Sequence, residues 1–231
     1  IDYADLADIA RGLEAKYAYN LDKANQIIGD EMKSLGATLG TDGKWQYKGK
    51  PVTLEFLIRR DGDGTRKPMG DYVSGQLEKV GFTVTRDYKK SSEAGPIWQK
   101  SDPVLCKWNM YTAGWINTGL ERDAKGDFQQ MYLNTSVQGI QPFLSNVADP
   151  ALQKLGDDLA NGNFTTAAQR HDMMAQALTL SLQDSLQVMI IDTRSFAPYN
   201  PKIQVSANLA AGIEMAPIAF YTLRYKDQIG G

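Results

Sequence analysis

The chain has 231 residues and a net charge of −2, with 42% hydrophobic and 23% charged residues. This composition is typical of globular proteins, and the length allows one large domain or two small ones. The near-neutral charge gives no general attraction to nucleic acid or to anionic lipid. No apolar run approaches the ~20 residues of a membrane span. Cys106 is the single cysteine, which excludes an intrachain disulfide and a zinc cluster of thiolates.

The first hundred residues begin with two predicted helices. Residues 2–17 carry apolar side chains at helical spacing, and residues 22–35 repeat the pattern. Asn20 is the expected N-cap of the second helix, and Gly36 is its expected end. Two glycine-containing turns follow and predict a small hairpin around residues 45–47.

A strand–helix–strand unit is the strongest prediction in the chain. Residues 52–58 alternate as a strand, and a charged, glycine-rich loop follows at 59–64. A helix is expected from about Pro68 to Gly81, and residues 82–88 alternate as a second strand. We expect the two strands to be parallel, with a right-handed crossover.

The remaining elements follow a less regular pattern. Residues 89–104 contain Pro96 and Pro103 and are expected to be irregular. The predicted strands are 107–113, 186–191 and 219–225, and the predicted helices are 127–133, 150–159 and 165–183. The fold class is therefore α/β, with a mixed β-sheet flanked by helices.

Catalytic, metal and cofactor motifs are not visible in the sequence. His171 is the one histidine and lies within an amphipathic helix, and Cys106 precedes a strand, which indicates a packed or inert thiol. There is no serine nucleophile elbow and no phosphate-binding loop. The segment 61–64 has aspartate and glycine in alternation but lacks the closing glutamate of a calcium loop. We therefore expect no cofactor and no catalytic residue, which favours a binding module over an enzyme.

Several short motifs occur in an order that resembles one protein family. They are residues 19–25 at a helix opening, Gly49–Leu54, the helix end and strand at 76–84, Tyr111–Trp115, and the segment from Arg170 into residues 186–190. Over about residues 17–205 this order resembles the second lobe of family 5 extracytoplasmic solute-binding proteins, the dipeptide- and oligopeptide-binding components of bacterial ABC importers.

The resemblance implies a periplasmic-binding-protein-like (type II) lobe spanning residues 1–231, the second lobe of a two-lobe protein. Residues from about 200 to 231 would include the segment that returns toward the first lobe. It also implies an extracytoplasmic location, in the periplasm or at the outer face of the cell membrane. The implied partners are a small solute, with an oligopeptide favoured, and the membrane permease of the importer. Two lobes of such a protein close over the ligand by a hinge motion.

Ligands of open α/β sheets meet the loops at the strand ends, which identifies two candidate loops. The first contains Arg59 and Arg60, and the second contains Trp115, Asn117 and Thr118. We expect Trp115 to form an apolar wall, and Asn117 with an arginine to make polar contacts.

Two features leave the ligand open. In peptide-binding relatives an aspartate follows the Gly-Trp pair and binds the peptide ammonium, whereas this sequence has Asn117 and Thr118 there, with Glu121 and Asp123 the nearest acids. Core packing for Trp115 and a solvated loop for the arginines are the structural alternatives. The alternative functions are a sensor or interaction domain that uses the same fold and, less favoured, an unrecognised hydrolase or transferase.

Overall fold

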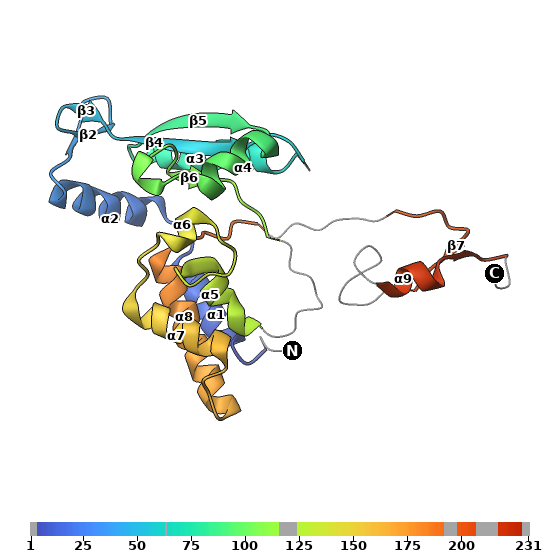
Figure 1. Cartoon of the computed structure of the whole chain (residues 1–231). Helices are drawn as coiled ribbons and strands as arrows, with labels where there is room; N and C mark the ends of the chain where they lie inside the picture. Colours follow the sequence, from blue (N-terminus) through green and yellow to red (C-terminus); the bar gives the residue numbers. More distant parts are fainter. Residues whose placement is uncertain (1–3, 63, 116–123, 192–197, 207–216, 228–231) are drawn as a thin grey trace.

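A computed structural model describes residues 4–62, 64–115, 124–191, 198–206 and 217–227 (Figure 1). Two helices open the chain: α1 is Ala7–Lys16 and α2 is Leu21–Ser34. The Asn20 side chain accepts a hydrogen bond from the Lys23 N–H (2.9 Å), so the predicted N-cap is confirmed. Gly36 follows the helix with φ 83°, a conformation that glycine adopts without strain.

A small antiparallel sheet follows α2 and confirms the predicted hairpin. Its strands are β1 (Thr38–Leu39), β2 (Trp45–Tyr47) and β3 (Lys50–Pro51), in the order β1-β2-β3. Trp45 is buried, and its Nε1–H donates to the Val80 carbonyl (2.9 Å) at the end of the next helix. This bond fixes the hairpin against the unit described next.

A parallel three-stranded sheet forms the centre of the α/β part of the chain. Its order is β5-β4-β6, and its elements are β4 (Thr53–Arg59), α3 (Arg66–Lys79), β5 (Thr83–Lys89), α4 (Ser91–Lys100), a 3₁₀ turn at Pro103–Leu105 and β6 (Met110–Tyr111). Strand β4 pairs with β5 from Thr53↔Thr83 to Arg59↔Lys89, so the predicted parallel unit is confirmed.

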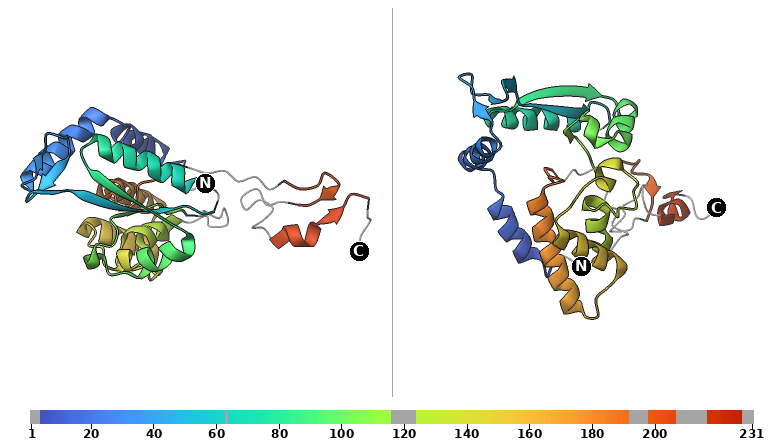
Figure 2. Two further views of the ribbon diagram at one scale, coloured as in Figure 1. Left: turned by 90° about the horizontal axis from the view of Figure 1, so that it is seen from above. Right: turned by 60° about the vertical axis from the view of Figure 1, so that its left-hand side comes forward.

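Helices α3 and α4 cover opposite faces of this sheet (Figure 2, left). Phe56 and Ile58 of β4 pack with apolar side chains of α3. Leu57, between them, faces the other way because successive strand side chains alternate. Tyr111 is in register with Leu57. Trp98 of α4 stacks on the Tyr111 ring, with ring centroids 4.9 Å apart.

A helical cluster forms the second hydrophobic core. It consists of α1, a 3₁₀ turn at Ala124–Gly126, α5 (Asp127–Tyr132), α7 (Pro150–Asn161) and α8 (Ala167–Asp184), with the short α6 (Gln141–Leu144) beside α4. Leu133, Leu152 and Leu159 are fully buried in it. The predicted helices 127–133, 150–159 and 165–183 are confirmed. Thr166 caps α8 by accepting from the Gln169 N–H (3.1 Å).

The carboxyl-terminal segments form an arm of their own. Strands β7 (Ile203–Gln204) and β8 (Arg224–Tyr225) pair antiparallel, and α9 (Pro217–Thr222) precedes β8. The arm lies apart from the sheet and the helical cluster in Figure 1 and in the left view of Figure 2. Large side chains of α9 are exposed, including Phe220 at 80% and Tyr221 at 88%.

The irregular segment predicted at 89–104 is wrong, because α4 occupies most of it. Its first turn is capped from two directions. The Glu93 carboxylate accepts from the Lys90 N–H (2.7 Å), and Asp61, thirty residues earlier, accepts from the Ser91 N–H (2.9 Å). Ala94 is fully buried and anchors the helix despite Pro96.

The third predicted strand, 107–113, is shorter than expected. The Asn109 side chain, in place of a backbone carbonyl, accepts from the Glu55 N–H (2.8 Å), so regular pairing begins only at Met110. Pairing with β4 ends at Tyr111.

The predicted strands 186–191 and 219–225 are wrong. Residues 186–191 hold no strand, and the Gln187 side chain there bonds the Met131 carbonyl (2.9 Å). Residues 217–222 form α9, where Thr222 Oγ1 donates to the Ile218 carbonyl (2.7 Å), and only Arg224–Tyr225 is extended.

The α/β class is confirmed. Parallel and antiparallel strands occur in separate small sheets instead of one mixed sheet. Among the residues that the structure describes, no helix is long and apolar enough to cross a membrane.

Candidate functional site

The carboxyl edge of the parallel sheet brings three loops together. Strands β4 and β5 end in register at Arg59 and Lys89, and β6 ends at Tyr111, opposite Leu57. Because all three strands run in the same direction, the segments that follow them begin at one edge. This edge is where open α/β sheets bind ligands.

Arg59 holds the loop after β4 in place. Its Nε lies 2.7 Å from Asp61 Oδ1, and Asp61 also accepts the Ser91 N–H at the start of α4. The bond from Arg59, followed by the one from Ser91, holds the pKa of Asp61 below its usual range. Asp61 is therefore an ionised carboxylate that joins the loop to α4, and Arg59 is its counter-ion.

Arg60 is placed differently from Arg59. Its backbone N–H donates to the Lys89 carbonyl (2.9 Å), which continues the pairing of β4 with β5 by one residue. Its side chain is exposed at the carboxyl edge. Of the two predicted arginines, Arg60 is the more accessible to a ligand.

Arg66 is a cation at this edge that the sequence analysis missed. Its Nη1 donates to the Thr112 carbonyl (3.2 Å), while Thr112 Oγ1 accepts from the Arg59 N–H (2.9 Å). A Cβ on Gly114 would lie 2.7 Å from Arg66 Nη2, so the guanidinium fits closely over the glycine. The position of Arg66 at this edge depends on a long-range contact between α3 and the loop after β6, which no local sequence motif indicates.

Trp115 links the loop after β6 to the helical cluster. Its indole N–H donates to Gln187 Oε1 (3.1 Å), and its ring stacks against Phe143 with centroids 6.5 Å apart. The residue remains 38% exposed, so part of its surface is accessible to a ligand. Asn117 and Thr118 lie outside the described residues, as do Glu121 and Asp123.

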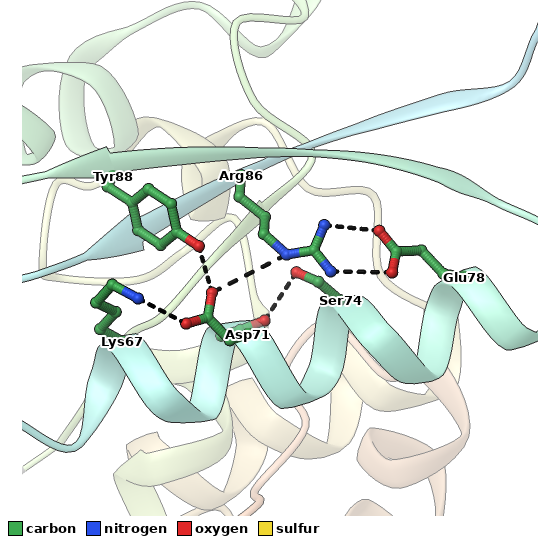
Figure 3. Close-up of polar contacts among 7 residues, drawn as sticks. Lys67, Asp71, Ser74, Glu78, Arg86 and Tyr88 are labelled. Atoms are coloured by element: carbon green, nitrogen blue, oxygen red, sulfur yellow. Dashed lines mark hydrogen bonds and ion pairs between the residues drawn. The ribbon is translucent and has the colours of Figure 1, made fainter.

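A network of charged groups holds α3 against β5 and so positions the first turn of α3, which carries Arg66 (Figure 3). Asp71 bonds Lys67 Nζ (2.8 Å) and the Tyr88 hydroxyl, and Arg86 forms a two-pronged pair with Glu78 (2.6 and 2.9 Å).

Hydrogen bonds in this network keep the Asp71 and Glu78 carboxyl groups ionised. The bond from Lys67, then that from Tyr88, lowers the pKa of Asp71, and the bond from Arg86 lowers the pKa of Glu78. Carboxylates held ionised in this way stabilise the fold and do not provide the proton transfer of a general acid.

The other titratable candidates lie away from this edge. His171 Nδ1 lies 3.3 Å from Asp172, and its Nε2 lies 3.3 Å from the Asp5 carbonyl, which raises its pKa. Cys106 is an exposed free thiol, which corrects the expectation of a packed one, although an inert role remains a prediction. Within the described ranges, no group of three or more His, Cys, Asp or Glu side chains could hold a metal ion.

Solved structures share the fold of this chain. NikZ from Campylobacter jejuni, in complex with Ni(L-His), superposes with a TM-score of 0.54 at 16% identity, over 73% of this chain and 31% of that one. The oligopeptide-binding protein AppA from Bacillus subtilis, in complex with a nonapeptide, gives 0.54 at 16% identity, over 72% and 30%. A mannohexaose-bound periplasmic oligopeptide-binding protein from Thermotoga maritima gives 0.52 at 19% identity, over 75% and 31%.

These likenesses show a shared fold alone, because the identities are too low to carry a ligand or a role from one protein to another. The chain spans about a third of the length of these three proteins. No protein-family model and no curated protein matches it.

Proposed function

We propose that this chain is the second lobe of a family 5 extracytoplasmic solute-binding protein, which captures a small solute for an ABC importer and does not catalyse a reaction. The observation that carries the proposal is the carboxyl edge of the parallel sheet, where the loop with Arg60 begins and where Arg66 contacts the loop that leads to Trp115, on a fold shared with solved binding proteins. A partly exposed aromatic ring and two arginines in loops at one edge suit a solute that has both apolar and anionic or polar parts.

Two features of this edge support a peptide or a similar compound as the solute class. A guanidinium binds a carboxylate in a planar, two-pronged geometry, and an exposed indole face covers apolar groups. The three compared proteins, which share this fold, are in complex with Ni(L-His), a nonapeptide and mannohexaose. The permease partner and the extracytoplasmic location belong to the same proposal.

One lobe provides one wall of such a site. In this proposal residues 1–231 form the second lobe, and the segment from about residue 200 onward reaches the first lobe. The exposed apolar side chains of α9, including Phe220 and Tyr221, suit burial against that lobe. We therefore expect the 231-residue chain alone to bind the transported solute far more weakly than the two-lobe protein does.

The test uses the two-lobe protein, with its co-purified solute identified by mass spectrometry and its affinity measured by calorimetry. Trp115→Ala should weaken binding about 30-fold, as expected for an aromatic anchor worth ~2 kcal/mol. Arg60→Ala should weaken it about fivefold, for a charged contact worth ~1 kcal/mol. Arg59→Ala is less informative because it also removes the partner of Asp61.

Matched controls come from exposed side chains elsewhere. Arg11 pairs with Asp8 on α1 and has a side chain 74% exposed, and Tyr72 is 59% exposed on α3. Arg11→Ala and Tyr72→Ala should leave the affinity unchanged. Wild-type affinity in both Trp115→Ala and Arg60→Ala would refute the site.

A further inference from the structure

A pocket opens away from the carboxyl edge. It has a volume of about 320 Å³ and lies between the start of β6, the α6 region and the end of α8. Its walls include Trp108, Asn109, Pro142, Ser145, Asn146 and Leu186. Asn109 pairs with Glu55, which precedes Arg59 by four residues on β4, so the pocket lies roughly 13 Å from the edge described above.

Two amide side chains in this pocket are held by hydrogen bonds to the backbone, one as an acceptor and the other as a donor. Asn109 Oδ1 accepts from the Glu55 N–H (2.8 Å), which leaves its NH₂ group as a donor. Asn146 Nδ2 donates to the Tyr132 carbonyl (2.7 Å), which leaves its carbonyl oxygen as an acceptor. The pocket lining thus includes one amide donor and one amide acceptor that these two bonds leave available.

The remaining walls are apolar or neutral. Trp108, Pro142 and Leu186 provide apolar surface, and Ser145 provides a hydroxyl. None of the described lining residues carries a charge, so an ion would lose hydration there without gaining a counter-charge. The volume is at the lower end of the ~300–1,000 Å³ typical of small-molecule sites, which suits a ligand of one or two rings.

We propose that this pocket binds a neutral, hydroxyl-rich solute, a saccharide of one or two rings. A sugar ring has apolar C–H faces that suit the indole and proline surfaces, and its edge hydroxyls both donate and accept. Those hydroxyls match the free NH₂ of Asn109 and the free oxygen of Asn146. All the lining residues named above belong to this chain, so the proposal goes beyond the proposed function and does not depend on a second lobe.

The test is a titration of the ¹⁵N-labelled 231-residue chain with glucose and with maltose, followed by NMR. The four tryptophans give four indole N–H signals, and Trp108→Phe identifies the one in the pocket. We expect the Trp108 signal to shift with saturation, at a dissociation constant on the order of 1–10 mM, since a few neutral hydrogen bonds are formed in an open pocket. Glutamate, a charged solute, should leave that signal unchanged.

Two variants separate specific binding from a general effect of added solute. Ser145→Ala removes the hydroxyl, while the Ser145 backbone N–H keeps its bond to the Gln141 carbonyl (2.9 Å). Asn109→Asp keeps the acceptor for Glu55 and removes the donor. Each should weaken sugar binding about fivefold.

The outcomes that overturn the proposal are distinct from failure of the proposed function. A Trp108 signal that does not shift, or that shifts equally in wild type and both variants, refutes the pocket. A shift confined to the Trp115 signal refutes it too, because the sugar then binds at the carboxyl edge, and that result supports the proposed function. A saturable Trp108 shift that both variants weaken supports the pocket whether or not a two-lobe protein exists.

Discussion

Replacing Gly70 by alanine tests how closely α3 packs on the parallel sheet. Gly70 is buried, and a Cβ there would lie 2.8 Å from Ile58 Cγ1, 2.8 Å from Cγ2 and 2.9 Å from Cδ1. Ile58 is 0% exposed and β-branched, so it has no free space to move into. The added methyl group must therefore push α3 away from β4.

Two effects of opposite sign determine the size of the change. Alanine is favoured over glycine within a helix by ~1 kcal/mol. Overpacking of a rigid core position costs ~1–3 kcal/mol. Because three atoms of one fixed side chain are in the way, the steric cost prevails. A steric cost in the upper part of that range, ~2–3 kcal/mol, less the ~1 kcal/mol gained in the helix, should lower the free energy of unfolding of Gly70→Ala by about 1–2 kcal/mol.

The matched control lies on the same helix. A Cβ on Gly75 would have no neighbouring atom within 4 Å, so Gly75→Ala should stabilise the chain by about 0.5–1 kcal/mol. Urea unfolding followed by tryptophan fluorescence reports on this region, since Trp45, Trp98 and Trp108 all lie in the sheet part. If both variants move the midpoint in the same direction, or Gly70→Ala is the more stable, the close-packing argument is refuted.

Three further changes have definite expected results. Gly81→Ala places a side chain at φ 95° and 2.7 Å from the buried Trp45 ring, so urea unfolding should show a loss of about 2–4 kcal/mol. Arg86→Gln breaks the pair with Glu78 and should cost about 0.5–1 kcal/mol after allowance for solvent screening. The loss should shrink in 1 M salt and as the pH falls below about 4.5, through the lowered folded-state pKa of Glu78, and equal losses at pH 7 and pH 2 would contradict the assignment. His171 has a raised pKa in the folded chain, so its protonated form stabilises the fold. This stabilisation is complete below the unfolded pKa of 6.5 and is lost as the pH rises through the folded-state pKa. Melting curves of His171→Gln should therefore differ from wild type at pH 5.5 and coincide with it at pH 9.

The strand–helix–strand unit could be predicted because its signals are local. Alternation over residues 52–58 and 82–88, with the helix between them, fixes both the elements and their parallel pairing. The cap at Asn20 was predictable for the same reason, since it acts on an amide three residues away.

The failures occur where distant contacts decide the structure. Helix α4 depends on Asp61, thirty residues before the amide that it caps, while Pro96 and Pro103 locally indicate a break. Residues 186–191 are mostly apolar and include β-branched side chains, as in a buried strand, but a strand exists only where a partner edge pairs with it. There the side chain of Gln187 is bound to Met131 instead.

The candidate site was partly accessible to sequence reasoning. The strand pattern placed Arg59, Arg60 and Trp115 after strands that end at one edge, and the structure brings these ends together. Their role in binding a ligand stays a prediction. The pairing of Arg59 with Asp61 and the contact of Arg66 with Thr112 depend on loop geometry, which no spacing in the sequence encodes.

The two separate hydrophobic cores imply a sequence of events during synthesis. The sheet core draws on residues 53–89 together with β6, a nearly continuous stretch that can close as soon as it leaves the ribosome. The helical core must bring α1, among the first residues made, against α8, which ends at Asp184. The apolar side of α1 therefore stays exposed, without α8 to cover it, while more than a hundred residues are added. This interval is when a nascent chain of this kind most needs protection from aggregation.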